Sequence, residues 1–231
     1  MTDRENLFRP VHKGIRAMVY ELGLRLGVAD FTNQAESDQL ATQLRHDLSE
    51  SVSNCILCLL RAHSGHEERD YFSAIRPFDA EAVDLMLVEH REIKRRIYHL
   101  SKSCEELLGI SDPARRIEVG DRLTQEANDL FALYLSHLNN EEAVLVPVMW
   151  ERFTDSQLRA LRAQFYNAIP VARFEEWMRW TLPALNTNEL VVLLSGMRTD
   201  PAPNRFDEAM RIAKETLGPE RLAAIGARLE Q

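Results

Sequence analysis

The sequence lacks the features that mark several classes of protein. Its 231 residues include only three cysteines, nine glycines and nine prolines, and 7% of them are aromatic. An odd and small number of cysteines fits a reducing compartment better than a disulfide framework, and so little glycine and proline excludes a collagenous or low-complexity chain. No apolar run reaches the length of about 18 residues that a membrane-spanning helix needs, and no apolar stretch follows the charged N-terminus. We therefore expect a cytoplasmic protein with no membrane partner.

Positive charge is also scarce. The chain has 28 Lys and Arg against 36 Asp and Glu, a formal net charge of -8. This balance leaves no basic surface of the kind that binds phosphate backbones, so we expect no nucleic-acid partner. The remaining composition, 45% hydrophobic and 28% charged, is that of a folded chain long enough for one substantial core.

The hydrophobic pattern predicts an all-α protein. Apolar residues recur at spacings of three and four, and no segment alternates with period two for long enough to form a strand. Four long helices are predicted, over Phe8–Leu26, Leu44–Ile75, Val83–Leu107 and Pro113–Val148. The polar stretch 30–37 is interpreted as a loop, and the pair Arg115 and Arg116 as part of a solvated face. Short links favour an up-down-up-down antiparallel four-helix bundle over residues 1–152.

After Trp150 the pattern changes to shorter helical segments. They are expected to be separated by Pro170, Pro183, Gly196 and the turn at 201–203. We interpret residues 153–231 as a C-terminal helical extension, which packs on the bundle or forms a docking surface for a protein partner or for self-association.

Six polar residues interrupt the apolar stripes at positions where a core would normally place Leu or Ile. They are His12, His63, Glu67, His90, His137 and Glu141. Burying such groups without partners costs on the order of several kcal/mol, so they need mutual pairing or a metal ion. His63 with Glu67 and His137 with Glu141 are i, i+4 pairs on one helix face, and in an antiparallel bundle all six meet in one layer. Two carboxylates able to bridge, with histidines from four helices, predict a dinuclear site suited to iron, with manganese or zinc possible.

This order of residues, His, then His-x-x-x-Glu, then His, then His-x-x-x-Glu, resembles that of the hemerythrin-like HHE domains over about residues 8 to 150. The resemblance implies that the six residues bind two non-haem iron ions, oxo- or hydroxo-bridged, with Glu67 and Glu141 bridging. It also implies that a small oxidant or gas, such as O2, peroxide or NO, occupies an open position.

Two departures from the oxygen-carrying hemerythrins bear on function. Those proteins have a second histidine one turn after the ligand of the third helix, where this chain has Lys94. They also place the last carboxylate one residue later, at Glu142, which we predict to support the site without binding metal. A site with fewer nitrogen ligands is better suited to a sensor or protective protein than to oxygen carriage. Two alternatives stay open: a di-iron enzyme of the peroxide-decomposing or ferroxidase type, and a structural or interaction bundle with zinc or no metal.

Tyr134 and His66 lie close to the six residues in the sequence, and each allows two interpretations. Tyr134 lies one turn before His137 and could hydrogen-bond a metal-bound oxygen species. It could instead be a core aromatic residue whose hydroxyl reaches the solvent-exposed edge of the core. His66 could turn toward the site, although His63 is the better ligand.

The extension loosely resembles the segment after the hemerythrin domain in plant iron-sensing ubiquitin ligases. The residues that carry this resemblance are Ile169-Pro170, Trp177, Trp180, Leu182-Pro183 and Leu190. Nothing here resembles the zinc-binding modules of those ligases.

Overall fold

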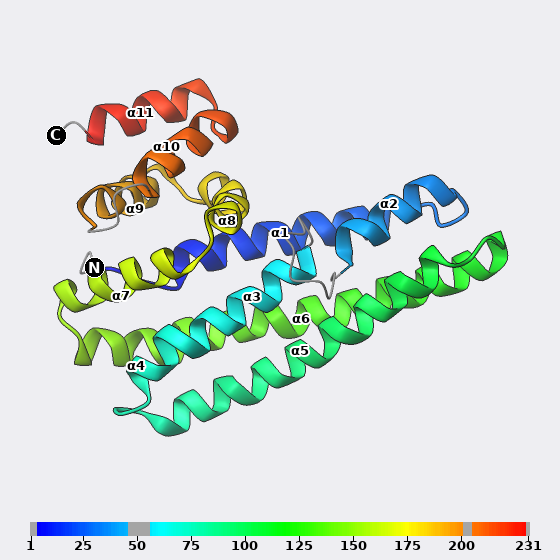
Figure 1. Ribbon diagram of the computed structural model, residues 1–231, viewed down its shortest axis with the longest axis horizontal. Helices are drawn as coiled ribbons and strands as arrows, with labels where there is room; N and C mark the ends of the chain where they lie inside the picture. The colour runs from blue at the N-terminus through cyan, green and yellow to red at the C-terminus, as the bar shows by residue number, and fades with distance from the viewer. Residues whose placement is uncertain (1–3, 46–55, 201–204, 230–231) are drawn as a thin grey trace.

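The structure is a computed structural model that describes residues 4–45, 56–200 and 205–229 (Figure 1). All the regular secondary structure in these ranges is helical, which confirms the all-α prediction. In chain order the elements are α1 (Arg9–Gly27), α2 (Gln34–Leu44), α3 (Ile56–Glu67), the π-helix η1 (Glu68–Phe72), α4 (Ser73–Ile75), α5 (Ala80–Leu108), α6 (Pro113–Arg152), α7 (Asp155–Ala168), α8 (Val171–Ala184), α9 (Thr187–Thr199), α10 (Arg205–Thr216) and α11 (Pro219–Leu229). No helix within the described ranges is long and apolar enough to cross a membrane.

The helices α1, α5 and α6 and the segment formed by α3, η1 and α4 lie side by side with their axes roughly aligned (Figure 1). Their apolar stripes face one another and form a core whose side chains are almost completely buried. The helices α5 and α6 are joined by a short link and pack along their lengths, so they run in opposite directions. These are the segments in which the sequence predicts the four long helices.

The starts of α5 and α6 are set by local capping. The side chain of Asp79 accepts a hydrogen bond from the backbone N–H of Ala82 at 2.9 Å, and that of Asp112 accepts one from Arg115 at 2.8 Å. Each such cap contributes about 1 kcal/mol, and Pro113 suits the first helical turn because its missing N–H would have no partner there. The fourth helix therefore begins at Pro113 as predicted, and the third begins at Ala80, one turn before the predicted Val83.

The prediction for the second helix is wrong at its start. The helix α2 begins inside the polar stretch for which the sequence predicts a loop, and Leu44 is its last residue, not the first residue of the next helix. Asn33 caps α2 by accepting from the backbone N–H of Glu36, and Leu40 and Leu44 turn toward the core. A local cap and a short apolar face thus outweigh the polar composition. Residues 46–55, which include part of the predicted helix, lie outside the described residues.

Arg116 is buried, which corrects the prediction of a solvated side chain. Its guanidinium donates to the backbone carbonyls of Leu107 and Ile110 at 3.1 and 2.6 Å, and to Asp38 at 2.6 Å. These acceptors are a carbonyl of the last turn of α5, a carbonyl of the link that follows it and a carboxylate of α2, so one charged side chain joins three segments. Arg115, its neighbour, is exposed as predicted.

The helix α8 packs against α1, and α9 to α11 lie beyond it, on the side of α1 away from α5 (Figure 1), whereas α7 contacts η1. Gly14 of α1 lies close to Thr181 of α8, because a Cβ on Gly14 would lie 2.9 Å from the Cα of Thr181. Pro170 separates α7 from α8 as predicted. Pro183 and Gly196 do not separate helices: Pro183 lies in the last turn of α8, and Gly196 lies inside α9. The predicted turn at 201–203 lies outside the described residues.

Candidate metal centre

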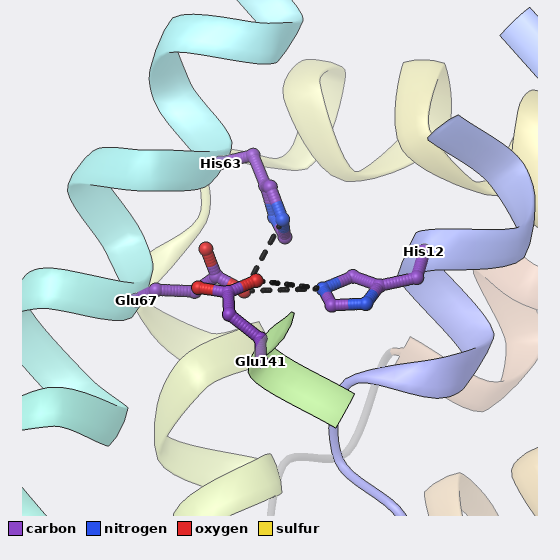
Figure 2. Close-up of side chains that lie close together, drawn as sticks. All are labelled: His12, His63, Glu67 and Glu141. Carbon is purple, nitrogen blue, oxygen red and sulfur yellow. Dashed lines mark hydrogen bonds and ion pairs between the residues drawn. The ribbon is translucent and has the colours of Figure 1, made fainter. Parts of the chain in front are cut away.

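The structure brings together all six residues that the sequence singles out. They come from four helices: His12 from α1, His63 and Glu67 from α3, His90 from α5, and His137 and Glu141 from α6. Each side chain is at most 2% exposed. Figure 2 shows four of them pointing toward one another across the core. The i, i+4 pairing of the sequence therefore places imidazoles and carboxylates in one buried layer.

Two histidines and both carboxylates form a first group. The Nε2 atom of His12 lies 3.4 Å from Oε1 of Glu67 and 3.3 Å from Oε2 of Glu141. The Nε2 atom of His63 lies 3.2 Å from the same Oε1 of Glu67. One imidazole nitrogen from each histidine and one oxygen from each carboxylate therefore surround a single point.

The other two histidines form a second group with the same carboxylates. The Nε2 atom of His90 lies 3.6 Å from Oε2 of Glu67 and 3.5 Å from Oε1 of Glu141. The Nε2 atom of His137 lies 3.2 Å from that oxygen of Glu141. Each carboxylate thus offers one oxygen to the first group and the other oxygen to the second.

The buried polar atoms are poorly satisfied by one another. Within the described residues, no hydrogen bond reaches Nε2 of His63, His90 or His137, Oε2 of Glu67, or either carboxylate oxygen of Glu141. Their separations exceed the roughly 2.7 to 2.9 Å of a charge-assisted hydrogen bond. Two ligand atoms about 2.1 Å from a common ion, at tetrahedral or octahedral angles, are about 3.0 to 3.4 Å apart. The donor set and its spacing therefore fit metal ions better than mutual pairing.

Three histidines hold their second ring nitrogen against a carboxylate outside this layer. The Nδ1 atom of His12 lies 3.0 Å from Glu142, that of His90 lies 2.9 Å from Glu68, and that of His137 lies 2.7 Å from Glu89. A carboxylate acceptor keeps the proton on Nδ1 and leaves the lone pair of Nε2 facing inward. Glu142, which the sequence predicts to support the site, thus contacts His12, whereas the sequence analysis does not point to Glu68 or Glu89.

Lys94, which stands where oxygen carriers have a second histidine, takes no place among the six residues. Its ammonium lies 2.7 Å from Glu68, the acceptor of His90. Arg16 has the same role on α1, since it donates to Glu142 at 2.8 Å. Both cations lie four residues after a histidine of the site and stabilise the carboxylate that orients it.

The two central carboxyl groups differ in acidity. Burial and the neighbouring charge of Glu141 raise the pKa of Glu67 above its ordinary value. Burial also opposes ionisation of Glu141, but His137, His12 and His90 outweigh it and hold the pKa of Glu141 well below its usual range. Two buried carboxylates so close to each other repel, so one retains its proton more readily until a cation neutralises both.

Tyr134 and His66 lie beside the centre without joining it. The hydroxyl of Tyr134 donates to the backbone carbonyl of Leu60 at 2.9 Å, and the side chain is fully buried. The prediction of a hydroxyl at the solvent-exposed edge of the core is therefore wrong. The hydroxyl is buried and bound to the backbone of α3. The ring of His66 contacts Phe165 of α7 with centroids 5.6 Å apart.

The helices after α6 reach the centre through α8. The indole of Trp177 lies 5.7 Å from the imidazole of His63, measured between ring centroids. His63 is thus enclosed by an aromatic ring from α8 on one side and by the ring of Tyr134 on another, at 6.4 Å. The buried layer of histidines and glutamates is therefore covered partly by Trp177, a residue of the predicted extension.

An all-α fold with a buried layer of four histidines and two glutamates defines a class of metal-binding helical proteins. The hemerythrin HHE cation-binding domain matches residues 5–149, and the chain belongs to this family. It is also 26% identical over 197 residues to a BRUTUS-like zinc finger protein of Arabidopsis thaliana. That match covers 84% of this chain and is longer than residues 1–152, so it includes part of the helices after α6. The chain spans only 15% of the relative's length. No solved structure matches the chain.

Proposed function

We propose that the protein is a non-haem di-iron protein that binds a small oxidant or gas and acts as a sensor or protective protein. The proposal includes an up-down-up-down bundle over residues 1–152, with His12, His63, Glu67, His90, His137 and Glu141 as ligands. The observation that supports it best is that Glu67 and Glu141 belong to both four-residue groups, as carboxylates that bridge two ions do. Mixed nitrogen and oxygen donors suit iron, while manganese or zinc would accept the same set.

The chain's own residues select small ligands and prepare the donor atoms. The six side chains are at most 2% exposed, so a large substrate could not reach them without opening the core. Glu68, Glu89 and Glu142 hold three imidazoles in the orientation and protonation state that a metal ion needs. Iron bound there would supply one-electron redox chemistry and open positions for O2, peroxide or NO.

A role in sensing is supported by the contact between the centre and α8. Trp177 packs against His63, and Thr181 lies against Gly14, two residues after His12. A displacement of His12 or His63 would therefore change the contacts of α8 directly. We propose that residues 153–231, which include α8, form a separate helical extension. The relative's match extends into this part of the chain, so a protein partner for the extension is part of the proposal.

Absorption spectroscopy of the iron-loaded protein tests the proposal. The account predicts a near-ultraviolet charge-transfer band of a coupled di-iron centre, which changes once and in proportion to the protein when peroxide is added. Sustained loss of peroxide over many equivalents would instead identify an enzyme. A colourless protein that keeps zinc, or no metal, after iron loading would identify a structural bundle and overturn the proposal.

A further inference from the structure

The two halves of the centre correspond residue by residue. His63, Glu67 and Glu68 on α3 and η1 match His137, Glu141 and Glu142 on α6 in sequence spacing. His12 and Arg16 on α1 match His90 and Lys94 on α5 in the same way. The contacts follow this correspondence, because Arg16 and His12 share Glu142 just as Lys94 and His90 share Glu68.

The correspondence fails at one position. Glu89 precedes His90 on α5 and lies 2.7 Å from Nδ1 of His137. The equivalent residue on α1, which precedes His12, is Val11. No carboxylate is therefore supplied to His63, and among the described residues its Nδ1 atom has no hydrogen-bond partner. Its ring is instead enclosed by the aromatic rings of Trp177 and Tyr134.

The charges around the two histidine pairs also differ. The His90 and His137 pair is flanked by two carboxylates, Glu68 and Glu89, with one cation, Lys94, on the first of them. Glu89 is held by a neutral group, the side-chain amide of Asn140, at 2.7 Å. By contrast, His12 and His63 are flanked by one carboxylate, Glu142, which carries two cations: Arg16 at 2.8 Å and Arg9 at 3.9 Å.

Both differences act on metal affinity in the same direction. A carboxylate on Nδ1 increases the basicity of the metal-binding nitrogen and fixes the ring, and losing it typically lowers metal affinity about 10- to 100-fold. The formal charge of the groups flanking His90 and His137 is negative, whereas that of the groups flanking His12 and His63 is positive. A divalent cation is therefore stabilised more in the former pair.

We propose that the two half-sites are inequivalent: the first metal ion binds tightly between His90 and His137, and the second binds more weakly between His12 and His63. The inference rests on the proposed two-metal centre and adds an order of binding to it. Glu89 is then a positioning residue for the tight half-site. The weak half-site is the one that contacts Trp177 of α8.

Titration of the metal-free chain with Co2+ against a competing chelator tests the order of binding. His137→Ala and His63→Ala form a matched pair, because each removes one imidazole from one half-site. In the wild-type chain we expect two binding steps. His137→Ala should weaken the tight step by at least about tenfold, whereas His63→Ala should leave that step unchanged and remove the weak one. The reverse pattern, or equal effects of the two variants, would overturn the inference.

Glu89→Gln provides a second test that keeps all six proposed ligands. It should weaken the tight step about 10- to 100-fold, whereas Glu92→Gln, at the surface of the same helix, should leave it unchanged. Equal titrations of Glu89→Gln and the wild-type chain would contradict the inference even if the histidine variants failed to fold. Failure of the wild-type chain to bind any Co2+ would instead refute the metal centre itself, so the two failures are distinguishable.

Discussion

The carboxylates of Glu67 and Glu141 are both buried and lie 3.4 and 3.3 Å from the same nitrogen atom, Nε2 of His12. Without a cation between them, two negative charges would face each other in an apolar core, and the pKa of Glu67 is raised accordingly. A metal ion removes this repulsion and satisfies the unpaired oxygens. The stability of the fold should therefore depend on metal.

We expect metal binding to raise the melting temperature, because an ion that binds only the folded state stabilises it. A concentration of 100 times the Kd contributes about 2.7 kcal/mol, or about 5 to 10 °C for a chain of this size. The double variant Glu67→Gln/Glu141→Gln should lose this increase. The matched control Glu81→Gln/Glu118→Gln, at exposed positions, should keep it. Thermal unfolding with and without Zn2+ measures both, and an equal increase in the two double variants would contradict the account.

Gly14 should be a position where even one methyl group is harmful. A Cβ there would lie 2.9 Å from Cα and 3.0 Å from the backbone nitrogen of Thr181, so α8 would have to move away from α1. We expect Gly14→Ala to destabilise the chain by about 1 to 3 kcal/mol. Gly23→Ala on the same helix meets no atom within 4 Å and should be neutral or stabilising by up to about 1 kcal/mol. Urea unfolding compares them, and equal midpoints would show that α1 and α8 do not pack this closely.

The positions of the six central residues could be predicted because local spacing carries the information. A histidine and a glutamate at i, i+4 share a helix face, and Asp79 and Asp112 mark the starts of α5 and α6. Their partners could not be predicted in this way. Glu68 lies 22 residues before His90, and Glu89 lies 48 residues before His137, so both contacts depend on how the helices face each other. The doubled Glu-Glu of each His-x-x-x-Glu-Glu segment was the available signal for Glu68 and Glu142, whereas Glu89 lies outside both segments.

The burial of Arg116 illustrates a second limit of the sequence. A neighbouring pair of arginines is typical of a solvated face, and Arg115 behaves in that way. Arg116 is instead enclosed by the carbonyls at the end of α5 and by Asp38 of α2. The capping of α2 by Asn33, which brings that carboxylate into place, was hidden in a stretch of polar residues.

Trp177 should report on the occupancy of the centre. Its indole lies 5.7 Å from the ring of His63, close enough for a bound ion with unpaired d electrons to quench its emission. We expect Co2+ to reduce the tryptophan fluorescence of the wild-type chain, and Trp177→Phe to lose most of the reduction. Trp180→Phe, on the same helix but beside the groove that contains Arg25, should keep it. Equal quenching in Trp177→Phe and the wild-type chain would show that Trp177 does not lie beside the bound ion.

Cys104 should make stability fall in alkaline solution. Burial raises the pKa of this thiol to about 12, whereas in the unfolded chain it ionises near its ordinary value of 9.0. Its contribution is therefore complete below about pH 9 and is lost as the pH rises toward 12, at up to about 1.4 kcal/mol per pH unit. Cys104→Ala should show a shallower decline between about pH 8 and pH 10. Urea unfolding at both values measures it, and parallel declines would refute the shift.

The metal content of the chain purified from iron-supplied cells is the most direct test of the two-metal centre. We expect two iron ions per chain, because two four-residue groups share Glu67 and Glu141. We also expect that Glu67→Gln/Glu141→Gln purified in parallel retains neither ion. A wild-type chain that holds no more metal than this variant would contradict the account.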